Sequence, residues 1–154
     1  MDIKNLENKF KIFKESINFN YSLKKLNWFN IGGNTKIYFK PNSLNDLIKF
    51  LKLYEYNKNL FVLGAGSNVL FKDDLFDGAV IKLSKNFSRI SLLNENTIIA
   101  GSGVLDKLLS DFAMESSLSG FEFLSCIPGT IGGGIRMNSG CFDSEFKDIL
   151  VSVQ

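Results

Sequence analysis

The chain has 154 residues, of which 45% are hydrophobic and 22% charged, and 18 basic against 16 acidic residues leave a net charge of +2. This is the size and composition of one ordinary globular domain, so neither intrinsic disorder nor electrostatic binding of nucleic acid is expected. The absence of histidine excludes Ser-His-Asp and Cys-His catalysis, histidine general bases and histidine metal sites. No apolar run is long enough to span a bilayer and the charged N-terminus is unlike a signal peptide, which predicts a soluble cytoplasmic protein.

Hydrophobic periodicity predicts a mixture of helices and strands. Apolar residues recur three and four positions apart in the predicted helices, over residues 3–17, 44–54 and 104–117. Short apolar or alternating runs predict strands over residues 35–40, 60–63, 79–83, 90–93, 97–100 and 148–153. Because neighbouring strands are joined by short turns, the sequence predicts an α+β fold rather than a regular βαβ series.

The first candidate site is the loop Gly64-Ala65-Gly66-Ser67-Asn68, directly after a strand that is predicted to be buried. Successive backbone N–H groups in such a loop form a concavity that suits a phosphate, and Ser67 and Asn68 can add side-chain donors. The third glycine of a dinucleotide fingerprint and the GK[ST] ending of a P-loop are both missing. From the residues alone, a hairpin that uses glycine for its bend is the favoured interpretation.

The second candidate is the segment of residues 125–140, in which Pro128 fixes a bend and Gly129, Gly132, Gly133 and Gly134 remove side chains. Glycine costs about 0.5–1 kcal/mol relative to alanine in a regular element, so this density indicates close backbone approach to a flat or anionic ligand. A flexible loop is the alternative. The isoleucines of the segment make it too apolar for a simple linker, and ligand contact is favoured.

Three other features have less specific interpretations. Gly101-Ser102-Gly103 precedes a predicted helix and fits an anion site at the helix N-terminus or an ordinary helix entry equally well. Asp73, Asp74 and Asp77 are expected to form a solvated turn rather than a metal site. Cys126 and Cys141 have no zinc spacing and no basic activator, so both are predicted to be small packing residues.

Read together and in order, these motifs resemble the UDP-N-acetylenolpyruvoylglucosamine reductase family, whose members are also called UDP-N-acetylmuramate dehydrogenases. The matching pieces are the NWFNIGG segment (27–33), VLGAGSNVL (62–70), GSG (101–103), GFEF (120–123), IPGTIGG (127–133) and MNSG (137–140). The chain departs from the family at Trp28, where threonine is usual, and at Asn34-Thr35, Gly134 and both cysteines.

The resemblance implies an FAD-binding domain of the vanillyl-alcohol-oxidase and para-cresol-methylhydroxylase type. It would comprise an N-terminal helix (1–18) and an FAD-binding domain (19–154) of two subdomains, about 19–83 and 84–154, around the cofactor. The implied cofactor-binding residues are Gly64, Ala65, Gly66, Ser67, Asn68, Gly101, Pro128, Gly129, Thr130, Gly132, Gly133, Asn138 and Gly140.

In the family, NADPH reduces the flavin, and the reduced flavin passes hydride to the enolpyruvyl group of a UDP-sugar for peptidoglycan synthesis. The flavin carries the redox chemistry, so a chain without histidine is no obstacle. The family's catalytic serine, its late glutamate and its substrate domain have no counterpart here, so the resemblance implies a C-terminally incomplete fragment that is inactive alone. The alternatives are a stand-alone FAD or nucleotide module that serves a partner, and a flavin oxidase with the same cofactor fold.

Overall fold

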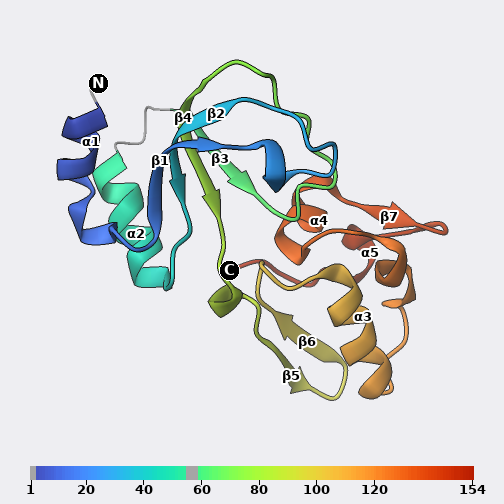
Figure 1. Cartoon of the computed structure of the whole chain (residues 1–154). Helices are drawn as coiled ribbons and strands as arrows, with labels where there is room; N and C mark the ends of the chain where they lie inside the picture. The colour runs from blue at the N-terminus through green and yellow to red at the C-terminus, as the bar shows by residue number, and fades with distance from the viewer. Residues whose placement is uncertain (1–2, 55–58) are drawn as a thin grey trace. The chain divides into compact units, whose positions relative to one another are not determined.

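The computed structural model describes residues 3–54 and 59–154, and the chain divides into two units, residues 1–84 and 85–154 (Figure 1). In the first unit, the elements are α1 (Ile3–Lys9), η1 (Lys11–Phe13), β1 (Ile17–Ser22), η2 (Lys24–Leu26), β2 (Asn34–Phe39), α2 (Leu44–Tyr54), β3 (Asn59–Leu63) and β4 (Phe76–Lys82). None of the helices within the described ranges has the length and apolar composition needed to cross a membrane.

The first unit is built on a four-stranded mixed sheet in the order β1-β2-β4-β3. β1 runs antiparallel to β2, whereas β4 is parallel to both of its neighbours. Because side chains alternate between the faces of a strand, Ile37 and Ile81 point to one face while Tyr38 and Val80 point to the other. The first face packs against α1 and α2 in a core of Leu6, Phe10, Phe13, Ile17, Ile37, Phe39, Phe50, Tyr54, Ala79 and Ile81.

The predicted helix over residues 44–54 is confirmed, with the Ser43 hydroxyl accepting a hydrogen bond from the Asp46 N–H at 3.1 Å. The predicted helix over residues 3–17 is wrong in its second half. α1 ends at Lys9, and Ile17 begins β1, where it pairs with Phe39. Ile17 fits the helical spacing of the preceding apolar residues, but pairing with β2 places it in the same core as part of a strand.

Two other expectations for the first unit are corrected. The strand over residues 60–63 is only partly buried: Leu63 is buried, whereas Leu60 and Val62 are exposed on β3, the edge strand of the sheet. Asp77 and Gly78 lie within β4 rather than in an acidic turn. Asp77 also forms an ion pair with Lys36 at 2.7 Å, so only Asp73 and Asp74 of the predicted solvated turn remain outside regular structure.

The second unit combines a β-hairpin with short helices. Its elements are η3 (Lys85–Phe87), β5 (Ile90–Asn94), β6 (Thr97–Ala100), α3 (Asp106–Glu115), η4 (Glu122–Cys126), α4 (Ile131–Met137), β7 (Gly140–Cys141), β8 (Ser144–Glu145) and α5 (Phe146–Ile149). β5 pairs antiparallel with β6, as the short connection predicted. The core of this unit is formed by Val104, Leu109, Phe123, Leu124, Ile131 and Phe146.

The helix predicted over residues 104–117 exists, but it begins at Asp106 and presents a different face to the core. Leu105 and Leu108, two of the recurring apolar residues on which the predicted helix rests, are 48% and 50% exposed. The buried positions are Asp106, Leu109, Ser110 and Ala113, which follow the i, i+3, i+4, i+7 spacing from the first helical residue.

The strand predicted over residues 148–153 is wrong. Phe146–Ile149 form α5, which starts with a reciprocal capping box between Glu145 and Asp148 and buries Phe146. Residues 150–154 have no regular structure, and Val151 and Val153 are exposed. The alternating apolar pattern therefore does not correspond to a paired strand.

Candidate functional site

The loop Gly64–Asn68 leaves the end of β3, and its geometry is not that of a hairpin. β3 and β4 are parallel, so residues 64–75 carry the chain back to the start of the neighbouring strand. The hairpin interpretation favoured from the sequence is therefore wrong. Gly66 has a φ of +80°, a left-handed conformation that side chains rarely adopt, which explains glycine at this position.

The backbone N–H groups of this loop are available to a ligand. Within residues 3–54 and 59–154, the N–H groups of Ala65, Gly66, Ser67 and Asn68 find no hydrogen-bond acceptor. Gly66 is nevertheless buried. Because buried backbone N–H groups are almost always paired in native proteins, the unpaired N–H of the buried Gly66 indicates an acceptor that comes from outside the chain. The half-buried Ala65 and Ser67 and the exposed Asn68 extend this row of donors.

A neighbouring turn holds the loop in place. The Trp28 N–H donates to the Gly66 carbonyl at 3.1 Å, and a β-carbon at position 66 would overlap the Leu26 carbonyl. The buried Asn27 braces the turn, since its Nδ2 donates to the carbonyls of Leu23 at 3.0 Å and Ile31 at 2.8 Å. The loop and the turn are thus one rigid substructure.

The paired glycines at the end of this turn allow a second close approach. The Gly33 N–H donates to the Lys72 carbonyl at 2.8 Å, and the Leu23 N–H donates to the Gly33 carbonyl at 2.9 Å. A β-carbon at Gly33 would overlap the Asp73 carbonyl, and one at Gly32 would lie 2.6 Å from the Phe71 Cβ. The Gly-Gly pair therefore packs against the far end of the connection that begins with Gly64.

Part of the second glycine-rich segment forms the helix α4 (Ile131–Met137), which was not predicted from the sequence. Thr130 is the N-cap of α4, and its hydroxyl accepts a hydrogen bond from the Gly133 N–H. The N–H groups of Ile131 and Gly132 donate to carbonyls of residues 104 and 102, each at 2.9 Å. The first turn of α4 therefore has no free N–H donors for the anionic ligand that the glycine density suggested.

Internal packing accounts for three of the four glycines between residues 129 and 134. A β-carbon at Gly134 would overlap the Phe146 ring, and one at Gly129 would overlap the Asp106 carboxyl group. A β-carbon at Gly132 would lie 2.9 Å from Ser102 Cβ. Gly133 is the exception, because its β-carbon would meet only the Thr130 hydroxyl at 3.3 Å.

Gly101 and Gly103 also use their N–H groups internally. They donate to the carbonyls of Arg89 at 2.8 Å and Phe87 at 3.0 Å. α3 begins three residues after Gly103, so these glycines do not form the N-terminus of that helix. Of the two interpretations left open, the anion site at a helix N-terminus is not supported, and the segment is a packed entry to the helix.

Asn138 and Gly140 lie at the end of α4 and in the β7–β8 pair. Asn138 has a φ of +47° and forms the C-cap of α4. Its side chain bridges to the following segment: Nδ2 donates to Glu145 Oε2, and Oδ1 accepts from the Lys147 N–H at 3.0 Å. Gly140 pairs with Glu145 in the β7–β8 ladder. Both residues thus position the turn that follows α4.

A family model for the FAD-binding domain matches residues 35–154, which include both glycine segments. The chain belongs to the FAD-binding domain family. It is 64% identical over 138 residues to the UDP-N-acetylenolpyruvoylglucosamine reductase of Pelagibacter ubique, covering 90% of this chain and 46% of that protein. It is 45% identical over 134 residues to the reductase of the same name from Rickettsia canadensis, covering 87% of this chain and 45% of that protein.

Among solved structures, the FAD-binding fold is shared with UDP-N-acetylenolpyruvylglucosamine reductase from Thermus caldophilus. The TM-score is 0.66 at 28% sequence identity, over 84% of this chain and 44% of that chain. The resemblance to these reductases and the predicted α+β FAD-binding fold are both confirmed. The chain spans about half the length of the relatives it matches.

One buried acidic residue was not singled out from the sequence. Asp106 is fully buried, and neither of its carboxylate oxygens has a hydrogen-bond partner in the described part of the chain. Burial raises the pKa of this carboxyl group to about 6. An aspartate in the first turn of a helix is common, so the sequence carries no signal that this FAD-binding domain buries one.

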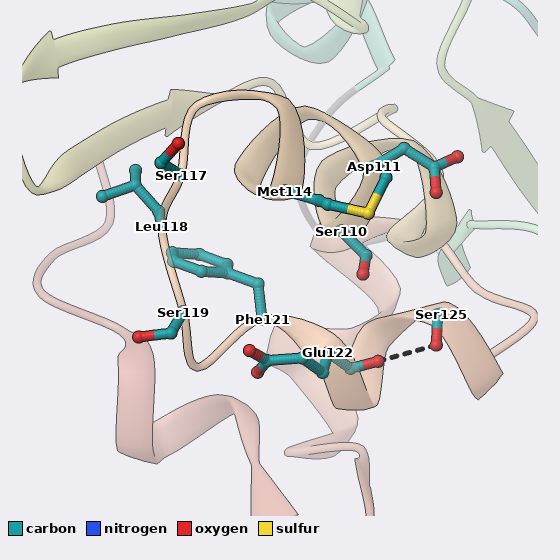
Figure 2. A pocket seen from close by; sticks show the side chains of 9 residues that line it. All are labelled: Ser110, Asp111, Met114, Ser117, Leu118, Ser119, Phe121, Glu122 and Ser125. Atoms are coloured by element: carbon teal, nitrogen blue, oxygen red, sulfur yellow. Dashed lines mark hydrogen bonds between the residues drawn. The ribbon is translucent and has the colours of Figure 1, made fainter.

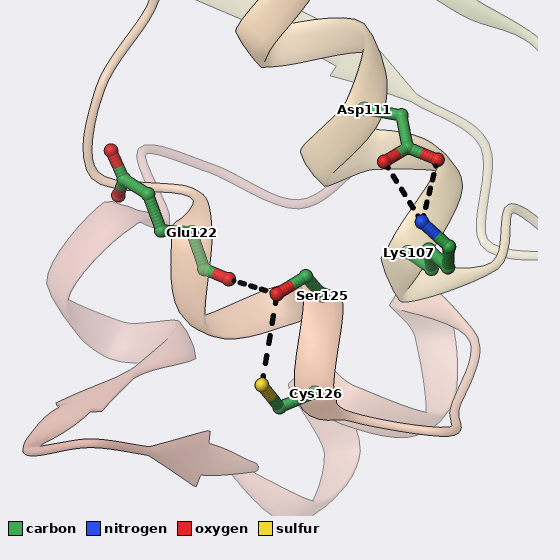
Figure 3. Close-up of polar contacts among 5 residues, drawn as sticks. All are labelled: Lys107, Asp111, Glu122, Ser125 and Cys126. Atoms are coloured by element: carbon green, nitrogen blue, oxygen red, sulfur yellow. Dashed lines mark hydrogen bonds and ion pairs between the residues drawn. The ribbon is translucent and has the colours of Figure 1, made fainter.

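A hollow in the second unit lies between α3 and η4 (Figure 2). It is lined by Ser110, Asp111, Met114, Ser117, Leu118, Ser119, Phe121, Glu122 and Ser125. The Ser125 hydroxyl donates to the Glu122 carbonyl at 2.7 Å, and Lys107 pairs with Asp111 at 3.1 Å on the exposed surface of α3 (Figure 3). Among the described residues, no three Cys, Asp or Glu side chains form a group that could hold a metal ion.

Proposed function

We propose that this chain binds FAD and that the loop Gly64–Asn68 holds the pyrophosphate. The observation that carries the proposal is the row of unpaired N–H groups from Ala65 to Asn68, in a chain of the FAD-binding domain family. A pyrophosphate is anionic and supplies several acceptor oxygens, which matches a concave row of backbone donors. The Ser67 hydroxyl and the Asn68 amide can add donors at the same place.

The remaining predicted cofactor-binding residues are part of the proposal, which takes residues 19–83 and 84–154 as the two FAD-binding subdomains. Most N–H groups of residues 125–140 are already bonded, and so is that of Gly101. These residues would therefore contact FAD through their shape or side chains rather than through a row of donors. They are Gly101, Pro128, Gly129, Thr130, Gly132, Gly133, Asn138 and Gly140.

The charge of the loop gives a direct test. Asn68→Asp places a carboxylate beside the proposed pyrophosphate, and repulsion between like charges should weaken FAD binding at least tenfold. Asn45→Asp makes the same change at an exposed position of α2 and should leave the affinity unchanged. The measurement is the dissociation constant of FAD by calorimetry, on variants shown by circular dichroism to be folded. Equal affinity of the two variants would refute the assignment of the loop.

We further propose that the chain forms a UDP-N-acetylenolpyruvoylglucosamine reductase together with the second half found in its relatives. The support is the 64% identity to the Pelagibacter ubique reductase, of which this chain covers 46%. In the complete reductase, FAD would accept hydride from NADPH and deliver it to the enolpyruvyl group of the UDP-sugar, as in peptidoglycan synthesis. This chain's part is to bind and orient the flavin, and a cytoplasmic location belongs to the same proposal.

A fusion tests the reductase. This chain would be joined to the part of the Pelagibacter ubique protein that it does not cover, and NADPH oxidation measured with and without the UDP-sugar. Oxidation that depends on the UDP-sugar supports the reductase. A fusion that binds FAD but never oxidises NADPH in response to the UDP-sugar would instead favour a stand-alone FAD module that serves another partner.

A further inference from the structure

Trp28 is the only tryptophan of the chain, and it is exposed beside the proposed pyrophosphate loop. Its side chain is 61% exposed, although its backbone N–H is bonded to the Gly66 carbonyl at 3.1 Å. Tryptophan buries a large apolar area when it has the opportunity, and an exposed indole whose backbone is bonded to the proposed ligand-binding loop is placed to contact a ligand held there.

The indole is also presented on a rigid support. Asn27 ties the preceding residues to the carbonyls of Leu23 and Ile31, as described above. After Trp28, the Asn30 N–H donates to the Asn27 carbonyl at 3.3 Å and the Asn30 side-chain amide donates to the Trp28 carbonyl at 3.3 Å. Both carbonyl and N–H of Trp28 are therefore fixed, which lowers the entropic cost of using its ring for binding.

FAD supplies a partner of the right chemistry. FAD carries an aromatic ring system on each side of its pyrophosphate, adenine on one side and isoalloxazine on the other. A pyrophosphate held at Ala65–Asn68 would therefore bring both ring systems near this loop. Flat aromatic heterocycles stack on indole rings, and this contact is tolerant of the identity of the heterocycle.

We infer that the indole of Trp28 is a stacking platform for one of the aromatic rings of the dinucleotide whose pyrophosphate is held by the loop Gly64–Asn68. This inference rests on the proposed function, and it deepens that function by naming a contact that sets ring affinity. The family resemblance places threonine at this position, so the platform is a property of this chain's own sequence.

Four proteins test the platform through FAD affinity: the unaltered chain, Trp28→Ala, Trp28→Phe and Phe29→Ala. Loss of the ring in Trp28→Ala should weaken FAD binding by about tenfold, and the phenyl ring of Trp28→Phe should recover most of that loss. Phe29 is 60% exposed and adjacent in sequence, which makes Phe29→Ala the matched control. Its affinity should remain within about twofold of the unaltered chain.

A second measurement reports on the indole itself. Because Trp28 is the sole tryptophan, acrylamide quenching of the chain's fluorescence measures the accessibility of this one ring. ADP and FMN are added separately. Protection by ADP identifies adenine as the stacked ring, and protection by FMN identifies isoalloxazine. ADP does not absorb tryptophan emission, so its effect is free of energy transfer.

The outcomes separate the inference from the proposed function. If the unaltered chain and Trp28→Ala bind FAD equally, or if neither ADP, FMN nor FAD protects the indole while FAD binds, the platform is refuted and the pyrophosphate loop stands. If the unaltered, folded chain does not bind FAD, the proposed function fails and the inference fails with it. Equal losses in Trp28→Ala and Trp28→Phe would also count against stacking, because the phenyl ring should substitute.

Discussion

The carboxyl group of Asp106 occupies the space in which a β-carbon at position 129 would stand, while the Asp106 N–H donates to the Gly129 carbonyl at 3.2 Å. Glycine at 129 is thus required by the buried acid that it faces, independently of any ligand. From the sequence, this glycine was expected to make room for a flat or anionic ligand. In the structure, the Asp106 side chain occupies that space.

Gly129→Ala is therefore expected to destabilise the protein. The added methyl group must displace Asp106, and overpacking of this kind costs about 1–3 kcal/mol. Urea unfolding would measure the loss. Gly133→Ala is the matched control, because its methyl group meets only the Thr130 hydroxyl at 3.3 Å, and its effect should stay within about 1 kcal/mol. Equal losses in the two variants would show that the overlap with Asp106 does not account for glycine at position 129.

A double variant isolates the contact. In an Asp106→Ala background the obstructing carboxyl group is gone, so adding Gly129→Ala should cost less than it does alone. The difference between the two costs is the coupling between these positions. Strictly additive effects would contradict the proposed overlap.

Asp106 also predicts a pH dependence of stability. Burial raises the pKa of its carboxyl group to about 6, so the folded state holds the proton more tightly than the unfolded chain does. The contribution of Asp106 to stability is then fully present below about pH 4, the carboxyl pKa of an unfolded chain, and is lost as the pH rises to about 6. Urea unfolding midpoints between pH 4 and 8 would measure this loss.

Asp106→Asn provides the comparison for this titration. The amide does not ionise, so the variant should lack the loss between pH 4 and 6 that the unaltered chain shows. Its stability relative to the unaltered chain should therefore rise with pH across that interval. A constant difference between the two proteins from pH 4 to 8 would mean that Asp106 titrates at its ordinary pKa and is not desolvated.

The sequence predicted those elements whose pattern is local and amphipathic. Residues 44–54 carry a polar cap and a continuous apolar face, and the hairpin of β5 and β6 has two short apolar runs around a tight turn. In both cases the information lies within about a dozen residues. The resemblance of the glycine segments to a known family could also be predicted, because it depends on motif order and not on packing.

What could not be predicted depends on contacts distant in sequence. The glycines of α4 argue against a helix by propensity, and the helix forms because Gly132 and Gly134 pack against Ser102 and Phe146. Likewise, nothing local distinguishes the N–H group of Gly66, which is unpaired, from that of Gly132, which is bonded to the Ser102 carbonyl. Only the fold decides which glycine segment offers free donors.

The two cysteines should differ in reactivity toward a thiol reagent. Cys126 was predicted to be a packing residue, but it is exposed at the end of η4, with its sulfur 3.7 Å from the Ser125 hydroxyl (Figure 3). Cys141 is half-buried against the core of the second unit. Ellman's reagent should label the Cys126 thiol rapidly and the Cys141 thiol slowly, and Cys126→Ser should abolish the rapid phase. A rapid phase that persists in Cys126→Ser would contradict this assignment.

Asn27 should be the most sensitive residue of the turn that supports the loop. Asn27→Ala removes the donor to the carbonyls of Leu23 and Ile31 and leaves both without this partner, a loss of about 2–4 kcal/mol in unfolding free energy. Asn45→Ala at an exposed helical position should be neutral or slightly stabilising, since alanine favours helices. Unfolding is followed by the fluorescence of Trp28, which reports on this turn alone because it is the only tryptophan. The same variant tests whether the turn supports the loop. If the turn holds the loop in its binding conformation, the folded Asn27→Ala protein should also bind FAD more weakly. Unchanged stability and affinity would show that the backbone bond between Trp28 and Gly66 is sufficient by itself.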